Sequence, residues 1–162
     1  MEMTLSMGLW VMLLGTFMAS LFFGIRNMTT NYYETGEYTN ISLFFENMVA
    51  IIKENEASVK KYNAIDNTLM ITDKSGNTYV LYFQSNDDKE LDNNYTAKDY
   101  TIRLQKLDKK NKGFTYGHGR WLLKEVAPPP LSFIKLNDGY IDFKIKNTHI
   151  GFGPFQTSIS YK

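Results

Sequence analysis

The chain of 162 residues contains no cysteine and only two histidines, His118 and His149. Without cysteine there is no disulfide framework, no thiol nucleophile, no iron–sulfur ligation and no cysteine-based zinc site. Two histidines also disfavour a histidine-rich metal site, and the residue spacing of an EF-hand calcium loop is absent. The sequence therefore predicts neither a metal nor another cofactor.

Charge and catalytic motifs are also scarce. The net charge is only +1, so the whole chain offers no general attraction to nucleic acid or to an anionic surface. No phosphate-binding P-loop sequence is present. His118 lies between two glycines without a serine or cysteine motif, and Asp87 and Asp88 lie in a polar loop. We therefore predict that the protein is not an enzyme.

Only one long apolar run occurs, from Met3 to Ile25, and it contains no charged residue. As a helix with a rise of about 1.5 Å per residue it would be roughly 34 Å long, enough to cross a hydrocarbon core of about 30 Å. It is too long for the apolar core of a cleaved signal peptide, and no positive residue precedes it. We predict a single membrane-spanning helix that carries one water-facing domain.

The charges that flank this run leave its orientation open. Glu2 precedes the run, and the first cation, Arg26, follows it. By the positive-inside tendency, Arg26 alone would place the domain in the cytoplasm. Alternatively, the chain as given lacks a basic leader, and the domain is then extracytoplasmic.

A second helical pattern follows the apolar run. Apolar residues spaced three and four apart indicate one buried helix face: Ile41, Phe44, Phe45, Met48, Val49 and Ile52. Thr39 or Asn40 is suited to cap the start of this helix, and the lysines at 60–61 suit its carboxyl end. Residues 27–39 are rich in Thr, Asn, Tyr and Gly, so they form either weak helix or a break near Gly36.

From Tyr62 onward the apolar period changes to two, which predicts strands. The expected strands are 69–71, 78–84, 100–107, 120–126, 131–136, 140–145 and 155–161. Glycine-containing turns at 73–77 and 137–139 predict two hairpins, and the prolines at 128–130 end a strand. The predicted fold class is α+β, a long amino-terminal helix packed on an antiparallel β-sheet. We divide the chain into a transmembrane helix (1–25), its continuation (26–61) and a sheet domain (62–162).

This order of elements resembles the plan of type IV pilins and pseudopilins. Met1-Glu2 through Ser6-Met7 resembles the Leu-Glu-x-x-x-Ser-Leu opening of several Gram-positive minor pilins, with Glu2 on the pilin glutamate. Gly119 to Leu123, the proline-bounded Val126 to Phe133 and the hairpin into residues 141–146 look like the minor pilins of Gram-positive competence pili, ComGF-type proteins in particular. The resemblance spans nearly the whole chain, and the specific motif is the amino-terminal one.

The resemblance implies a minor subunit of a type IV-like competence pilus for DNA uptake, acting in pilus initiation or at its tip. The implied partners are other minor pilins, the major pilin and the prepilin peptidase. The implied location is the cell membrane, with an extracytoplasmic domain, and the cell surface after assembly. We expect Met1 to be an internal methionine with the leader upstream. Glu2 would act in assembly by pairing with the amino terminus of a neighbouring subunit.

A basic region offers a candidate surface for DNA. From Arg103 to Lys124, seven cationic side chains stand against the single acid Asp108, a net charge of +6. Aromatic residues are interleaved with them, and such a mixture suits single-stranded or non-specific DNA binding. The alternative is a solvated hairpin whose aromatic rings lie in the core. The candidate DNA contacts are Lys109, Lys110, Lys112 and Arg120.

Two other functions remain open at this point. One is a single-pass, membrane-anchored extracytoplasmic binding domain that does not polymerise. The other is an anchored accessory subunit that faces the cytoplasm, which Arg26 alone would allow. The reading frame upstream of Met1 separates the pilin from both, because a prepilin leader ends in Gly before the mature helix.

Overall fold

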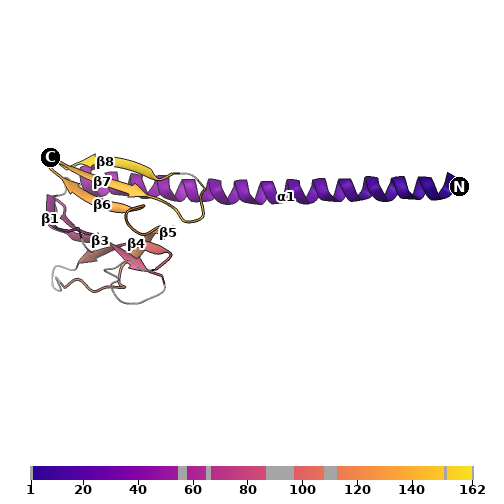
Figure 1. The fold of residues 1–162 in the computed structure, drawn as a ribbon. Helices are drawn as coiled ribbons and strands as arrows, with labels where there is room; N and C mark the ends of the chain where they lie inside the picture. The colour runs from indigo at the N-terminus through magenta and orange to yellow at the C-terminus, as the bar shows by residue number, and fades with distance from the viewer. Residues whose placement is uncertain are drawn as a thin grey trace. The chain divides into compact units, whose positions relative to one another are not determined.

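The computed structural model describes residues 2–54, 58–64, 67–86, 97–107, 113–151 and 153–161, and for residues 2–7, 9 and 54 the backbone alone. The chain divides into two units, Met1–Gly36 and Glu37–Lys162. The first unit is helical throughout its described residues, and the second contains the end of the same helix and the described strands (Figure 1).

Helix α1 runs without interruption over Glu2–Val49 and continues into the π-helical turn η1, Ala50–Glu54. Of the two predictions for residues 27–39, the break near Gly36 is wrong and the continuous helix is confirmed. The prediction that Thr39 or Asn40 caps a new helix is also wrong, because both residues lie inside α1.

The threonine hydroxyls of this weak stretch are bonded within the helix. The hydroxyls of Thr29, Thr30 and Thr35 bond to backbone carbonyl oxygens three or four residues earlier, at 2.7 to 3.1 Å. A threonine usually weakens a helix when its hydroxyl draws the backbone into another conformation. Here the hydroxyls bond into the helix itself, so their polar groups are satisfied without a break.

The described residues of the second unit form two antiparallel sheets. The first has the order β1-β2-β3-β4-β5, with β1 Ser58–Asn63, β2 Thr68–Thr72, β3 Thr78–Ser85, β4 Tyr100–Leu107 and β5 Arg120–Val126. The second has the order β6-β7-β8, with β6 Phe133–Asn137, β7 Tyr140–Ile145 and β8 Phe155–Ser160. The predicted α+β class is confirmed, although the sequence predicted one sheet where the structure has two.

The core of the second unit joins the end of α1 to both sheets. Four residues of the predicted helical stripe are almost completely buried: Ile41, Phe44, Met48 and Ile52. The ring of Phe44 meets Phe143 of β7 edge-on at 5.8 Å, and Tyr38 meets Phe155 of β8 at 5.2 Å. Figure 1 shows β7 and β8 lying along this part of the helix. The predicted buried face of the helix is therefore confirmed.

Both predicted hairpins are present. Gly76, between β2 and β3, and Gly139, between β6 and β7, have φ of 79° and 83°, which glycine adopts without steric cost. In β7 the side chains of Ile141, Phe143 and Ile145 are completely buried, while the alternate positions face away from the core. Period-two alternation thus predicted the correct faces of this strand.

The predicted carboxyl end of the helix is wrong. Helical structure ends at Glu54, and the lysines at 60–61 lie in β1. A register shift between Val59 and Lys61 interrupts the pairing of β1 with β2. Because of this bulge, Val59 and Tyr62 both pack against the core although they are three residues apart. That spacing imitates a helix in the sequence.

Candidate functional site: the amino-terminal helix

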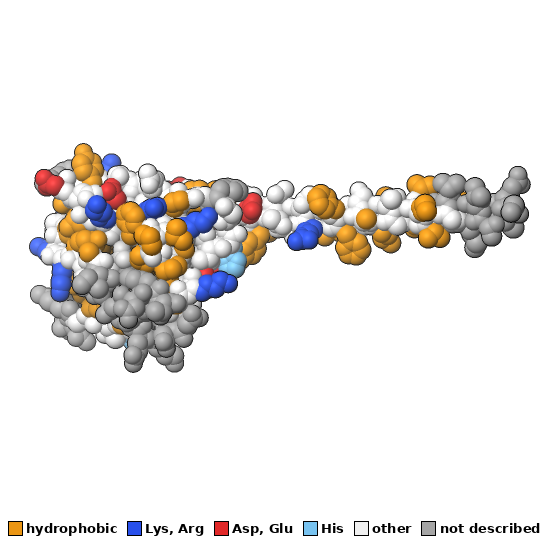
Figure 2. Space-filling model, in the orientation of Figure 1, with side chains coloured by type: hydrophobic (Ala, Val, Ile, Leu, Met, Phe, Trp, Pro, Cys, Tyr) orange, Lys and Arg blue, Asp and Glu red, His pale blue; other side chains and the backbone are white. Residues whose placement is uncertain are grey.

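In the first unit, apolar side chains lie on all sides of α1 from Trp10 to Phe23. Each of the five consecutive residues from Trp10 to Leu14 is between 56% and 75% exposed. Consecutive helical residues are about 100° apart, so five of them cover the whole circumference. The pattern continues through Phe17 and Met18 to Phe22 and Phe23, and Figure 2 shows the apolar side chains along the helix. A helix that is apolar all round requires lipid or other helices around it.

The polar group of Thr16, within this apolar segment, is satisfied by the helix itself. Its hydroxyl lies 3.0 Å from the carbonyl oxygen of Met12 and 2.9 Å from that of Leu13. In a hydrocarbon environment every backbone and side-chain polar group must find its partner within the protein. The internal bond of Thr16 meets that requirement.

By length and composition, α1 is able to cross a membrane. Its uncharged part ends at Arg26, where a cation can reach the polar headgroups. Beyond Arg26 the helix carries Tyr32 and Tyr33, which are 86% and 51% exposed. Tyrosine is enriched at membrane–water boundaries because it has an apolar ring and a polar tip. The order of side chains along α1 therefore changes from apolar to cationic to amphipathic.

Glu2, the predicted assembly residue, lies in the first turn of α1. Its side chain lies outside the part of the chain that the structure describes, so its role in assembly stays a prediction.

Within the second unit, a buried hydrogen bond joins Glu37 of α1 to Asn147, which follows β7. Asn147 is completely buried, and its side-chain amide donates to the carboxylate of Glu37 at 2.8 Å. Its oxygen accepts the backbone N–H groups of His149 at 2.7 Å and Ile150 at 3.2 Å. Sequence reasoning missed this pair, because 110 positions separate the two residues and neither belongs to a motif.

The predicted DNA region is only partly described. Lys109, Lys110 and Lys112 lie outside the described residues, and Arg120 is exposed at the start of β5. The ring of Phe114 packs edge-on against the ring of Tyr82, with 5.0 Å between the ring centroids. The ring of Tyr116 also packs against Tyr82, with 5.4 Å between the centroids. Trp121, in contrast, is 58% exposed. DNA contact by these residues stays a prediction.

Tyr82 of β3 and Arg103 of β4 hold the segment 113–119 against the first sheet. Its hydroxyl donates to the carbonyl oxygen of His118, and Arg103 donates to the carbonyl oxygen of Gly119 at 2.9 Å. Burial raises the pKa of Tyr82, although the Arg103 charge and a backbone hydrogen bond oppose this. The neutral phenol therefore persists above its ordinary pKa of about 10 and acts here as a donor.

Within the described residues, no three His, Asp or Glu side chains come together in a group that could hold a metal ion. No protein-family model, curated protein or solved structure matches this chain. The chemistry of α1 and the surfaces of the second unit are therefore the basis on which a function is proposed.

Proposed function

We propose that this chain is a minor pilin, a subunit that is held in a membrane by α1 and is then built into a type IV-like filament through the same helix. The observation that carries the proposal is the helix from Trp10 to Ile25, whose apolar side chains are exposed on every face. The same helix continues, without a break, into a segment that packs on antiparallel sheets.

A plain membrane anchor would need only the apolar segment. The further support for a filament subunit is the resemblance of the amino-terminal residues to pilins, together with the continuity of α1. In a filament, helices that are apolar all round bury one another in place of lipid, and no charged residue interrupts that surface between Met3 and Ile25. Glu2 would then pair with the amino terminus of a neighbouring subunit, which sets the register between helices.

The remaining parts of the proposal follow from the resemblance to competence pilins. The filament would serve DNA uptake, and this subunit would act in its initiation or at its tip. Other minor pilins and the major pilin would contact α1, after processing by a prepilin peptidase. The second unit would be extracytoplasmic, and it would reach the cell surface in the assembled pilus.

The decisive experiment uses the absence of cysteine, which makes any introduced cysteine unique. Val11→Cys and Phe17→Cys lie on the apolar helix, and Tyr140→Cys, 53% exposed on β7, is the matched control. In the organism that encodes the protein, a crosslinker with a thiol-reactive maleimide and a photoreactive benzophenone, which inserts into C–H bonds, should join the helix variants to pilins in the sheared surface fraction. The control variant should give different adducts or none.

Glu2→Ala tests the assembly residue. We expect this variant to reach the membrane with a folded second unit but to be depleted from the sheared surface fraction. Normal piliation by Glu2→Ala, without helix crosslinks to pilins, would contradict the filament role and favour the non-polymerising binding domain. A membrane-impermeant maleimide that labels Tyr140→Cys in intact cells would exclude the accessory subunit that faces the cytoplasm.

A further inference from the structure

One row of side chains crosses a face of the first sheet. Tyr82 of β3, Arg103 of β4 and Trp121 of β5 are successive cross-strand partners, and such partners share a face. At one end of the row the ring of Phe114 packs on Tyr82. At the other end the ammonium of Lys124 lies over the Trp121 ring, 4.6 Å from its centroid. We call these five residues the aromatic–cationic row.

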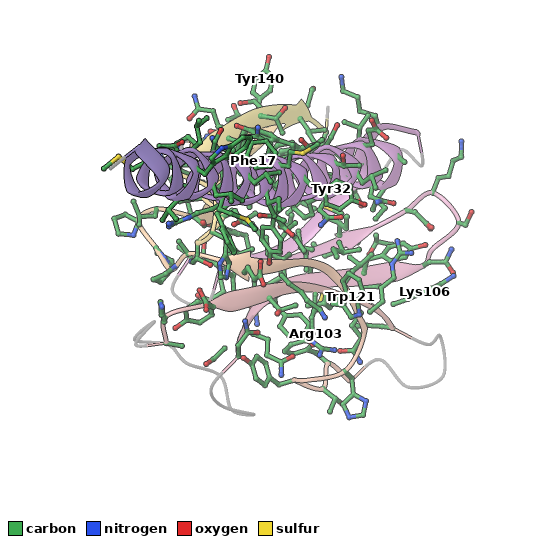
Figure 3. The ribbon with its side chains drawn as sticks, turned by 90° about the vertical axis from the view of Figure 1, so that its right-hand side faces the viewer. Phe17, Tyr32, Arg103, Lys106, Trp121 and Tyr140 are labelled. Carbon is green, nitrogen blue, oxygen red and sulfur yellow. The ribbon has the colours of Figure 1, made fainter. Side chains whose placement is uncertain are left out.

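Two aromatic rings of this row reach the solvent. Trp121 is 58% exposed, the highest value for a large apolar side chain among the described residues of the second unit, and Phe114 is 37% exposed. Lys124 is exposed as well. Arg103, the neighbour of Trp121 in Figure 3, is half-buried and donates from Nη1 to the carbonyl oxygen of Gly119 at 2.9 Å. The row therefore presents apolar rings beside cations at the surface.

No acid belongs to the aromatic–cationic row. Glu125 follows Lys124 in the chain, and its Oε1 lies 3.6 Å from Nε2 of His149. The exposed aromatic residue of the second sheet, Tyr140, has a different setting. Asp142 lies two residues further along β7 and so shares its face, where it accepts a hydrogen bond from Ser158 at 2.5 Å. An anionic surface is attracted to the row but repelled by the carboxylate near Tyr140.

A membrane offers a surface of matching chemistry. Tryptophan is enriched at membrane–water boundaries, and lysine and arginine extend towards lipid headgroups. By length and composition α1 is able to cross a membrane, and only residues 27–36 separate Arg26 from the second unit in the chain. The bilayer would therefore be a constant neighbour of the second unit. Such tethering makes even a weak contact effective, because docking becomes intramolecular.

We propose that the aromatic–cationic row docks the second unit on anionic phospholipid headgroups of the membrane that α1 spans. Trp121 and Phe114 enter the headgroup layer, while Arg103 and Lys124 bind lipid phosphates. The contact does not depend on assembly through α1, because an anchored domain that does not polymerise would make it as well. In a pilin it would hold the second unit at the membrane until the subunit enters the filament.

The test uses the full chain with Trp10→Phe, so that Trp121 is the only tryptophan. Single copies are placed in lipid nanodiscs of phosphatidylcholine, with or without about one third of anionic phosphatidylglycerol. A lipid that carries a nitroxide on its headgroup quenches a tryptophan docked nearby. We expect at least about fivefold stronger quenching of Trp121 in the anionic discs. This quenching should be lost near 1 M salt, where the screening length is about 3 Å.

Variants of one cation test the role of charge. Lys124→Glu reverses a cation of the row, and Lys135→Glu, the same change at an exposed position on β6, is the matched control. Each cation lost near an anionic surface lowers the docked population about fivefold, so Lys124→Glu should lose most of the quenching while Lys135→Glu keeps it. Lys124→Gln should lie between them. Unchanged amide hydrogen exchange in β3 and β4 verifies that each variant is folded.

Three results would overturn the proposal. The first is equal quenching of Trp121 in anionic and phosphatidylcholine discs. The second is equal quenching in Lys124→Glu and Lys135→Glu. The third is no quenching in the anionic discs, and binding of an oligothymidylate that depends on Lys124 would then make the row a nucleic-acid surface. The discs contain no other pilin, so failure of docking leaves the helix crosslinks as a separate test of the filament role.

Discussion

Two helical stretches of the chain differ in where their apolar side chains lie. From Trp10 to Ile25, apolar side chains lie on every face and are exposed. From Ile41 to Ile52 they form one stripe, and that stripe is buried against the sheets. The backbone is helical in both, so secondary structure alone does not separate them. The distribution of apolar residues around the axis decides whether a helix completes its own domain or needs other molecules.

The largest difference between the two stretches is expected from a matched pair of Phe→Ala substitutions. Phe44→Ala removes a buried ring that contacts Phe143, and we expect it to lower the free energy of unfolding of the second unit by about 3 to 5 kcal/mol. Phe17→Ala removes a ring that is 63% exposed, so it should change the free energy of unfolding of the second unit by no more than about 0.5 kcal/mol. Denaturant unfolding of the full chain in micelles measures both. Equal effects would mean that the two stretches do not differ in this way.

The reverse test introduces charge. Phe17→Lys should oppose membrane insertion by about 2.5 to 3.5 kcal/mol if it lies near the bilayer centre. Leu43→Lys, at a position 49% exposed on the packed stretch, should leave insertion unchanged. The fraction of each variant that stays in membranes after an alkaline carbonate wash is the measurement. Equal retention of Phe17→Lys and Leu43→Lys would mean that position 17 does not lie near the bilayer centre.

A smaller change in stability is expected at Glu37, just before the buried stripe Ile41–Ile52. Asn147→Ala leaves the Glu37 carboxylate and two backbone N–H groups without this partner, which should cost about 1 to 3 kcal/mol of stability. Asn40→Ala removes one exposed hydrogen bond to Glu37, 3.3 Å long, and is the control. If thermal unfolding of the two variants is indistinguishable, the buried amide does not fix the helix to the sheets.

The smallest expected effect is a pH dependence confined to the packed unit. The Asn77 side chain, with further hydrogen bonds from the Asn77 backbone and Tyr79, lowers the pKa of Asp73 although burial opposes this. A lowered pKa in the folded state stabilises the fold above the ordinary value of about 3.8, and this contribution is lost as the pH falls through the folded value. Unfolding between about pH 5 and pH 2 should therefore show a decline that Asp73→Asn reduces.

The apolar stretch has no titratable group from Met3 to Ile25, so it supplies the internal control. Its helicity, followed by far-ultraviolet circular dichroism of a peptide of that segment in micelles, should not change over the same pH range. A parallel change in both would assign the pH effect to the micelle rather than to Asp73.

Periodicity alone predicted much of this fold. The stripe at Ile41, Phe44, Met48 and Ile52 is buried, and both hairpins lie at the predicted turns. Such features are local, because the identity of neighbouring residues determines them. The apolar helix was predicted for the same reason. Composition and length placed the membrane-spanning segment in the first part of α1, whereas the assembly role of Glu2 was implied by the resemblance to pilins and stays a prediction.

The errors arose where distant contacts decide the structure. Val59 and Tyr62 have a helical spacing in the sequence, and only pairing with β2 produces the bulge that brings both to the core. The division into two sheets depends on which strands pair, and neighbouring residues do not encode that choice. The place of β5 at the end of the described first sheet follows from the strand order, so the sequence predicted the strand but not its position.

The threonine hydroxyls of α1 have one more consequence. Thr16, Thr29, Thr30 and Thr35 all bond back to carbonyl oxygens of their own helix. None of these hydroxyls requires a water molecule or a neighbouring subunit as its partner. A helix built in this way can leave a bilayer and enter a bundle of other helices without exchanging a single hydrogen bond of these side chains. For these residues the transfer would then change only apolar contacts, which are non-directional and can be renewed step by step along the axis.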